Sequence, residues 1–236
     1  VRGKDPDAVI GADDNARRVV ALPIAEEGRM PVVFCGVNWP ASAYGLPRDG
    51  LHGMVEVSPA DRLFDLLGEG LSPGDRVVIL GADRPTDRAQ AEGFIQTARA
   101  SGLEARAELV RTFDEWADAF ARAQEGVSLL YLLNNAGIRG WSDSRALDLV
   151  TRETRTLTAT EYVWMRPFAV VSVTKRGQEQ GRWSALHALH LIERPEFPMS
   201  PIVVNRDVSV SVNEELLSVS GRELPPVFDA LRGGLR

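Results

Sequence analysis

Short apolar runs rich in β-branched residues alternate with longer amphipathic stretches along nearly the whole chain. Strands that are apolar on both faces are typical of parallel sheets covered by helices, so this alternation limits the fold class. The strand candidates are residues 8–10, 31–35, 76–80, 128–133 and 156–160. The helix candidates are residues 13–28, 58–69, 86–101, 113–124, 143–153 and 175–194.

The helix expected at 113–124 carries the clearest local signal. Thr112 and Glu115 have the spacing of a capping box, in which each side chain bonds the backbone of the other residue. The helix before it is expected to end at Gly102, because glycine readily adopts the left-handed conformation that closes a helix.

Two irregular stretches interrupt the alternation. Residues 36–57 are rich in Gly and Pro and end in a short strand, and residues 194–212 contain three prolines followed by an apolar run. We interpret both stretches as crossings between two lobes. Since alternating strands and helices build right-handed βαβ units, the sequence predicts an α/β fold of two Rossmann-like lobes, each a parallel sheet flanked by helices.

Composition excludes several classes of protein. With 236 residues, 44% hydrophobic and 25% charged, the chain has an ordinary globular profile. The net charge of -6 and the lack of a basic cluster give no support for binding nucleic acid. Cys35 is the only cysteine, which excludes a disulfide framework and a cysteine metal site. No apolar run approaches the roughly 18 residues of a membrane span.

Three segments, in this order along the chain, carry motifs of one known family. Residues 31–39, Pro-Val-Val-Phe-Cys-Gly-Val-Asn-Trp, look like its strand and loop Pro-Ile-Val-Phe-x-Gly-Val. Residues 51–57 look like its crossover Asn-Val-Thr-Gly, with His52 in place of the usual Thr. Residues 203–226 look like its closing segment, which ends in Leu-x-Ile-Pro. The series resembles the ABC transporter substrate-binding protein family, which has the type I periplasmic-binding-protein fold.

The resemblance implies how the lobes divide the chain. Family members carry a signal peptide and about two more βα units before the strand at 8–10, whereas this sequence opens with Val1-Arg2-Gly3 shortly before that strand and shows no signal peptide. The N-terminal part of lobe 1 is therefore expected to be missing. The expected domains are residues 1–52 for the rest of lobe 1, 53–200 for lobe 2, and 201–236 for a crossing and return to lobe 1, with hinges near 51–57 and 194–212.

Candidate ligand-binding residues follow from the rule that ligands of open α/β sheets bind beyond the carboxyl ends of the strands. Amides, carboxylates and guanidinium groups in those loops offer directed hydrogen bonds, and aromatic rings offer stacking surfaces. For each residue the alternative is a structural role, such as a helix cap for Asp13 or Asp14, or packing for Trp39. The candidates are Asp13, Asp14, Asn15, Asn38, Trp39, Asp83, Arg84, Asn134, Asn135, Glu161 and Tyr162.

Enzymatic readings find less support. The run Asn-Asn-Ala-Gly at 134–137 also follows a core strand in short-chain dehydrogenases, but the glycine-rich dinucleotide turn is absent and Tyr162 is followed four residues later by Arg166 instead of Lys. His187 and His190 lie three residues apart, which without a third ligand is a weak metal signal. We therefore predict no catalytic residues, no metal, no cofactor and no enzyme activity.

The resulting hypothesis is an extracytoplasmic receptor, periplasmic or extracellular and membrane-associated. It would capture a small organic ligand, such as an amino acid, in an interlobe cleft and hand it to the membrane permease of an ABC importer. A ligand-sensing domain that reports to a sensor kinase is the first alternative. A Rossmann-like NAD(P)-dependent enzyme is a weaker one.

Overall fold

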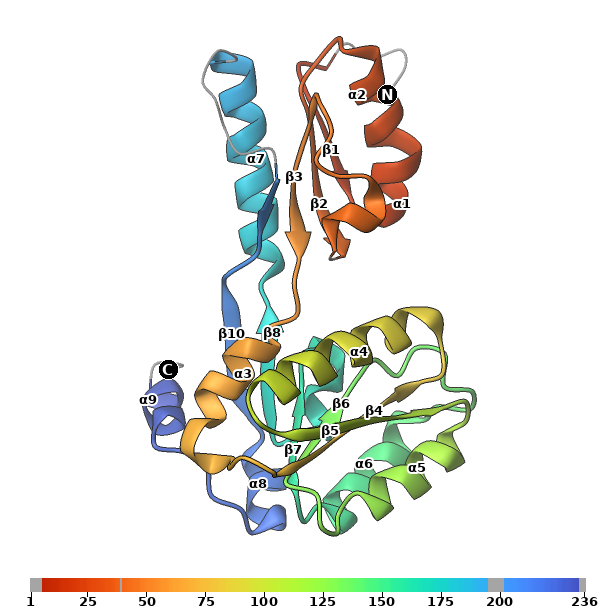
Figure 1. The fold of residues 1–236 in the computed structure, drawn as a ribbon, viewed down its shortest axis with the longest axis vertical. Coiled ribbons are helices and arrows are strands. Elements are labelled where there is room, and N and C mark those ends of the chain that lie inside the picture. The colour runs from red at the N-terminus through yellow and green to blue at the C-terminus, as the bar shows by residue number, and fades with distance from the viewer. Residues whose placement is uncertain (1–5, 39, 195–201, 234–236) are drawn as a thin grey trace. The chain divides into compact units, whose positions relative to one another are not determined.

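The computed structural model describes residues 6–38, 40–194 and 202–233, and it divides the chain into two α/β units (Figure 1). Unit 1 comprises residues 1–57 and 176–207, and unit 2 comprises residues 58–175 and 208–236. The chain therefore passes from one unit to the other three times. Within the described ranges, no helix is both long enough and apolar enough to cross a membrane.

Unit 1 is built on a four-stranded sheet in the order β1-β2-β3-β9, and every neighbouring pair is parallel. Because side chains alternate along a strand, Leu51 joins the core beside the helical segment that follows β1, whereas the next residue, His52, contacts His187 of α7. The strands are β1 (Val9–Ala12), β2 (Val32–Asn38), β3 (Leu51–Glu56) and β9 (Ile202–Val204). The helical elements are α1 (Asp14–Ala16), η1 (Arg17–Ala21), α2 (Leu22–Glu27), η2 (Ala41–Tyr44) and α7 (Gly177–Glu193).

Unit 2 is built on a six-stranded sheet in the order β10-β8-β7-β6-β4-β5, parallel except for β10 at one edge. The strands are β4 (Arg76–Ala82), β5 (Glu104–Val110), β6 (Leu129–Leu132), β7 (Leu157–Thr160), β8 (Val171–Lys175) and β10 (Val208–Val212). The helices are α3 (Ala60–Leu67), η3 (Gly68–Gly70), α4 (Pro85–Ala100), α5 (Phe113–Arg122), α6 (Asp143–Glu153), η4 (Val163–Phe168), α8 (Glu214–Ser220) and α9 (Val227–Gly233).

Helices cover both faces of the sheet in unit 2, with α3 and α4 on one face and α5 and α6 on the other (Figure 1). The core is strongly aromatic, and Trp116 and Phe120 are almost completely buried. The ring of Tyr131 stacks on that of Phe94 with 3.8 Å between their centroids. This packing fixes the direction of the Tyr131 hydroxyl at the carboxyl end of β6.

The predicted fold class is confirmed, and each helix and strand expected from the alternation is present with its ends shifted by a few residues at most. The capping box of Thr112 and Glu115 is formed, and Gly102 has the expected positive φ of 81°. Four strands and two short α-helices were not expected. The missed elements are β5, β8, β9, β10, α8 and α9.

The observed division of the chain differs from the expected lobe boundaries. Residues 176–207 belong with unit 1, because the side chain of Gln180 in α7 accepts from Gly36 N at 2.7 Å and donates to Glu56 at 2.6 Å. Residues 208–236 stay with unit 2 and do not return to lobe 1, because β10 pairs with β8. The expected hinges at 51–57 and 194–212 stay predictions, and residues 195–201 lie outside the described residues.

The capping box gives a stability test. Thr112 Oγ1 accepts from Glu115 N at 3.3 Å, so replacing Thr112 by Ala leaves that amide without its cap. We expect the free energy of unfolding in urea to fall by ~1 kcal/mol. The control is Thr151→Ala on the exposed side of α6, where alanine is the better helix former and no loss is expected. Equal effects of the two substitutions would contradict the capping role.

Candidate functional site

The sheet of unit 2 reverses its winding direction beside β4. The chain runs from β4 through α4 to β5 at the edge, and then returns through α5 to β6 on the other side of β4. Loops that leave neighbouring strands in opposite directions open a crevice, which is where doubly wound sheets bind ligands. Arg84 follows β4 and its Nη1 donates to the carbonyl of Ala136, in the loop after β6, at 2.7 Å. The two loops are thus tied together across this switch point.

Gly137 is the residue that permits this contact. Its φ of +100° favours glycine, and a Cβ built on it would lie 2.3 Å from Cδ of Arg84. In the same loop, Asn134 Oδ1 accepts from Ala136 N at 2.8 Å and from Trp164 Nε1 at 3.2 Å. The indole of Trp164 is held at the rim although 55% of this residue is exposed.

The carboxylate of Asp83 is paired with two arginines of the same unit. It forms an ion pair with Arg88 and a second one with Arg111, whose Nε lies 2.8 Å from Oδ2. Asn135 is half-buried, and its carbonyl accepts from Ile138 N at 3.1 Å. These residues shape the rim, and Arg84 and Trp164 are the more exposed groups on it.

Glu161 lies at the carboxyl end of β7 and is only 5% exposed. Its Oε2 accepts from Ser58 Oγ and from Tyr131 Oη, the latter at 2.8 Å. Lys175 Nζ, at the end of β8, is 4.0 Å from Oε1. Burial and the neighbouring Glu161 carboxylate raise the pKa of Tyr131 well above 10, so its hydroxyl stays a donor. We call these four residues the Glu161 cluster.

Tyr162 is buried, and its hydroxyl donates to Gln90 Oε1 at 2.5 Å. Its ring lies 5.1 Å from the Trp164 indole, centroid to centroid. The two rings form an aromatic pair just after Glu161 in the sequence. Tyr162 is packed inward and Trp164 is exposed. Of the expected residues in unit 2, Arg84 and Asn134 lie at the switch point, while Glu161 and Tyr162 stand at the end of β7.

The expected residues of unit 1 lie at the carboxyl ends of β1 and β2. Asp13 has φ +81° and ψ 169°, a conformation that strongly favours glycine, and backbone strain of this kind concentrates at functional sites. Its N–H donates to the Cys35 carbonyl at 2.9 Å, and its carboxylate caps the next helix by accepting from Ala16 N at 2.8 Å. The side chain therefore serves as a cap.

Asp14, the first residue of α1, and Asn38, the last residue of β2, are brought together. Asn38 Nδ2 donates to Asp14 Oδ2 at 3.0 Å, and Asn38 N lies 3.4 Å from Oδ1. Asn15 Oδ1 accepts from Arg18 at 3.3 Å. Trp39 lies outside the described residues. Unit 1 thus presents a small carboxylate–amide group at the ends of its strands.

Sequence reasoning missed several partners of the expected residues. Ser58 follows directly after a short strand, so the strand-end rule could have selected it. Tyr131 and Lys175 lie within strands, and their role depends on long-range pairing that no local pattern reveals. Gln180, which bridges Gly36 and Glu56, lies in the first turn of a helix and carries no signal of its own.

Two histidines of unit 1 contact each other, His52 in β3 and His187 in α7. His52 Nδ1 and His187 Nε2 are 2.9 Å apart, and His187 stacks on Trp183 with 4.4 Å between ring centroids. Burial, followed by repulsion from His52 and His190, lowers the pKa of His187 to about 4. Burial also lowers the pKa of His52. Among the described residues no group of three or more His, Cys, Asp or Glu side chains could hold a metal ion.

No protein-family model and no curated protein matches the chain. Solved structures do match. The ABC domain of Streptococcus pneumoniae in complex with L-Trp has a TM-score of 0.63 at 16% identity, over 97% of this chain and 80% of that one. The ligand-free, open structure of a substrate-binding protein with adhesive properties from Clostridium difficile has 0.70 at 15%, over 93% and 75%. A LacI family transcriptional regulator from Bifidobacterium animalis has 0.56 at 14%, over 86% and 75%.

Identities this low establish the fold alone. The chain has the type I periplasmic-binding-protein fold, as the resemblance implied. The neighbours with this fold are solute-binding proteins and transcriptional regulators. What the chain binds must therefore be argued from its own strand-end residues.

The histidine pair predicts a pH dependence of stability. The folded-state pKa of His187 is depressed to about 4, below the 6.5 of an unfolded histidine, so the unfolded state binds more protons between these values. Stability is therefore full above pH 6.5 and falls toward pH 4. We expect the free energy of unfolding to drop by ~2 kcal/mol from pH 7.5 to 5 through His187 alone. His187→Phe, which keeps a ring against Trp183, should flatten this slope in urea titrations, and an unchanged slope would contradict the assignment.

Proposed function

We propose that the chain is a solute-binding receptor that binds a small organic ligand at the carboxyl ends of its strands and passes it to the membrane permease of an ABC importer. Its place of action in this proposal is extracytoplasmic, either periplasmic or extracellular at the membrane. The observation that carries the proposal is the rim of unit 2. There the protein's own contacts hold Arg84 and Trp164 at a topological switch point.

The chemistry of this rim suits an amino acid or a similar solute. Nη1 of Arg84 donates to Ala136 and its Nε lies 4.0 Å from Asp87 Oδ2, so we propose that the remaining nitrogen, Nη2, binds a ligand carboxylate. The exposed indole of Trp164 offers a flat surface for an apolar or aromatic group. The Glu161 cluster lies at the end of β7 in the same sheet and reaches solvent at Ser58, whose hydroxyl donates to Glu161.

Capture between two lobes stays a prediction of the sequence. If the ligand makes contacts only in a closed form, it shifts an open–closed equilibrium toward that form. Small-angle X-ray scattering on the full chain measures this directly as a ligand-dependent fall in the radius of gyration.

A ligand-sensing domain is the second candidate. It is favoured by the transcriptional regulator with the same fold, which covers 86% of this chain. Both candidates need a ligand at the strand ends, and they differ in the partner. Ligand-dependent stimulation of a permease ATPase favours import, whereas ligand-dependent control of a kinase favours sensing.

The proposal predicts ligand-dependent thermal stabilisation. In a thermal-shift screen of the full chain against amino acids and other small solutes, at least one ligand should raise Tm. A ligand at about 100 times its Kd adds ~2.7 kcal/mol. Trp164→Ala should weaken that ligand by about tenfold or more, because an aromatic contact is lost.

The matched control is Val163→Ala, which removes the neighbouring exposed apolar side chain of η4 and should leave affinity unchanged. Failure of every solute to raise Tm would contradict the proposal. If Trp164→Ala binds the ligand with wild-type affinity, Trp164 and the rim of unit 2 are not the binding site.

A further inference from the structure

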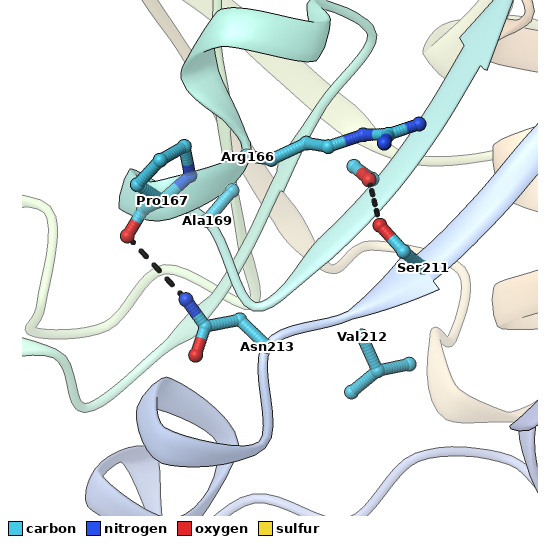
Figure 2. A pocket seen from close by; sticks show the side chains of 7 residues that line it. Arg166, Pro167, Ala169, Ser211, Val212 and Asn213 are labelled. Atoms are coloured by element: carbon cyan, nitrogen blue, oxygen red, sulfur yellow. Dashed lines mark hydrogen bonds between the residues drawn. The ribbon is translucent and has the colours of Figure 1, made fainter.

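A pocket lies at the opposite edge of the unit 2 sheet from β5, beside strands β8 and β10 (Figure 2). It has a volume of about 260 Å³, and Arg166, Pro167, Ser172, Ser211 and Asn213 are among the residues that line it. None of these residues belongs to the Glu161 cluster or to the switch point. The pocket is therefore a candidate for a separate binding site.

Strand alternation explains why this pocket is polar. Ser172 and Thr174 point to one face of β8, and their antiparallel partners in β10 are Ser211 and Ser209. Lys175, which approaches Glu161, points to the other face of β8. The pocket and the Glu161 cluster thus lie on opposite faces of the same strand.

The hydroxyls of Ser172 and Ser211 hydrogen-bond to each other and leave one hydroxyl hydrogen without an acceptor among the described residues. Ser172 Oγ and Ser211 Oγ are 2.6 Å apart, so one hydroxyl donates to the other. The accepting hydroxyl keeps its own hydrogen, for which no acceptor is present among the described residues. An oxygen of a bound group would complete the pair.

Arg166 reaches from η4 over this hydroxyl pair (Figure 2). Its Nη2 donates to Thr174 Oγ1 at 2.7 Å, while its Nε is buried and has no hydrogen-bond partner. Arg166 forms no ion pair with any residue in the described ranges. An unpaired buried donor is unfavourable, and more so in a charged group, so the contacts within the protein leave the hydrogen-bonding capacity of Arg166 unfilled.

We propose that this pocket binds the carboxylate of a small organic acid, with Arg166 and the Ser172–Ser211 pair as donors. A guanidinium binds a carboxylate through charge-assisted hydrogen bonds, and Nη1 of Arg166, which makes no hydrogen bond to the described residues, is the donor that a ligand in the pocket can reach. Arg166 is the single cation among the lining residues, so a monoanion balances its charge and a phosphate dianion does not. The volume is below the roughly 300–1,000 Å³ of drug-sized sites, which limits the ligand to a small acid.

The test is an NMR titration of the full ¹⁵N-labelled chain with sodium acetate, with sodium chloride replaced to keep ionic strength constant. We expect saturable shifts of the Arg166 Nε–H signal and of the backbone amides of Ser172 and Ser211. Arg166→Gln should weaken acetate binding by about tenfold or more, as expected when a charge-assisted pair is lost. Arg145→Gln removes an exposed arginine of the same unit, paired with Asp114, and should leave the titration unchanged.

Four outcomes would overturn the proposal. The first two are that acetate produces no saturable shift at these groups, and that Arg166→Gln responds as the wild type does. The third is that inorganic phosphate, titrated in parallel, binds more tightly than acetate, which would contradict the carboxylate assignment. The fourth is that the solute found by thermal shift also loses its binding in Arg166→Gln, which would make this pocket part of the main site.

Discussion

The buried carboxylate of Glu161 is the interaction on which the functional end of unit 2 depends. A charge that is only 5% exposed is tolerated when hydrogen bonds and a counter-charge compensate its lost hydration. Those partners come from three other elements: Ser58 before α3, Tyr131 in β6 and Lys175 at the end of β8. One side chain thereby fixes the carboxyl ends of β6, β7 and β8 relative to one another, and the rim residues are built on those ends.

The switch point adds the second constraint. Doubly wound sheets reverse direction where two crossovers leave neighbouring strands on opposite faces, and this geometry opens a crevice without any specialised residues. The features particular to this chain are the side chains at the crevice. Gly137 makes room for Arg84, and Asn134 holds the indole of Trp164 at the rim. Since transcriptional regulators share the fold, these side chains carry the functional argument and the fold does not.

The sequence predicted the elements whose signal is local. Strands apolar on both faces, such as β4, and the capped helix α5 were found because burial and capping leave a pattern in neighbouring residues. Strands β8 and β10 were missed, because both alternate valine with serine or threonine and are defined by pairing across the chain, with β10 at the sheet edge and β8 next to it. The same limit explains the lobe boundaries, since α7 joins unit 1 through long-range contacts of Gln180.

For the site, the strand-end rule selected loops but could not tell which of their side chains face solvent. Asp83 and Asp13 were both candidates for ligand binding. The Asp83 carboxylate forms ion pairs with Arg88 and Arg111, and the Asp13 carboxylate caps a helix. Whether any expected residue contacts a ligand stays a prediction. The structure sharpens that prediction to the exposed groups, and it adds Trp164, which was not among the candidates.

The most direct test of the central claim is the ¹⁵N–¹H spectrum of the indole groups while each common amino acid is added in turn to the full chain. A solute that binds the rim should shift the Nε1–H signal of Trp164, which is hydrogen-bonded to Asn134. The signal of Trp116, buried in the core of unit 2, should stay in place. If no amino acid moves the Trp164 signal, or if one binds tightly without doing so, the rim of unit 2 is not the binding site.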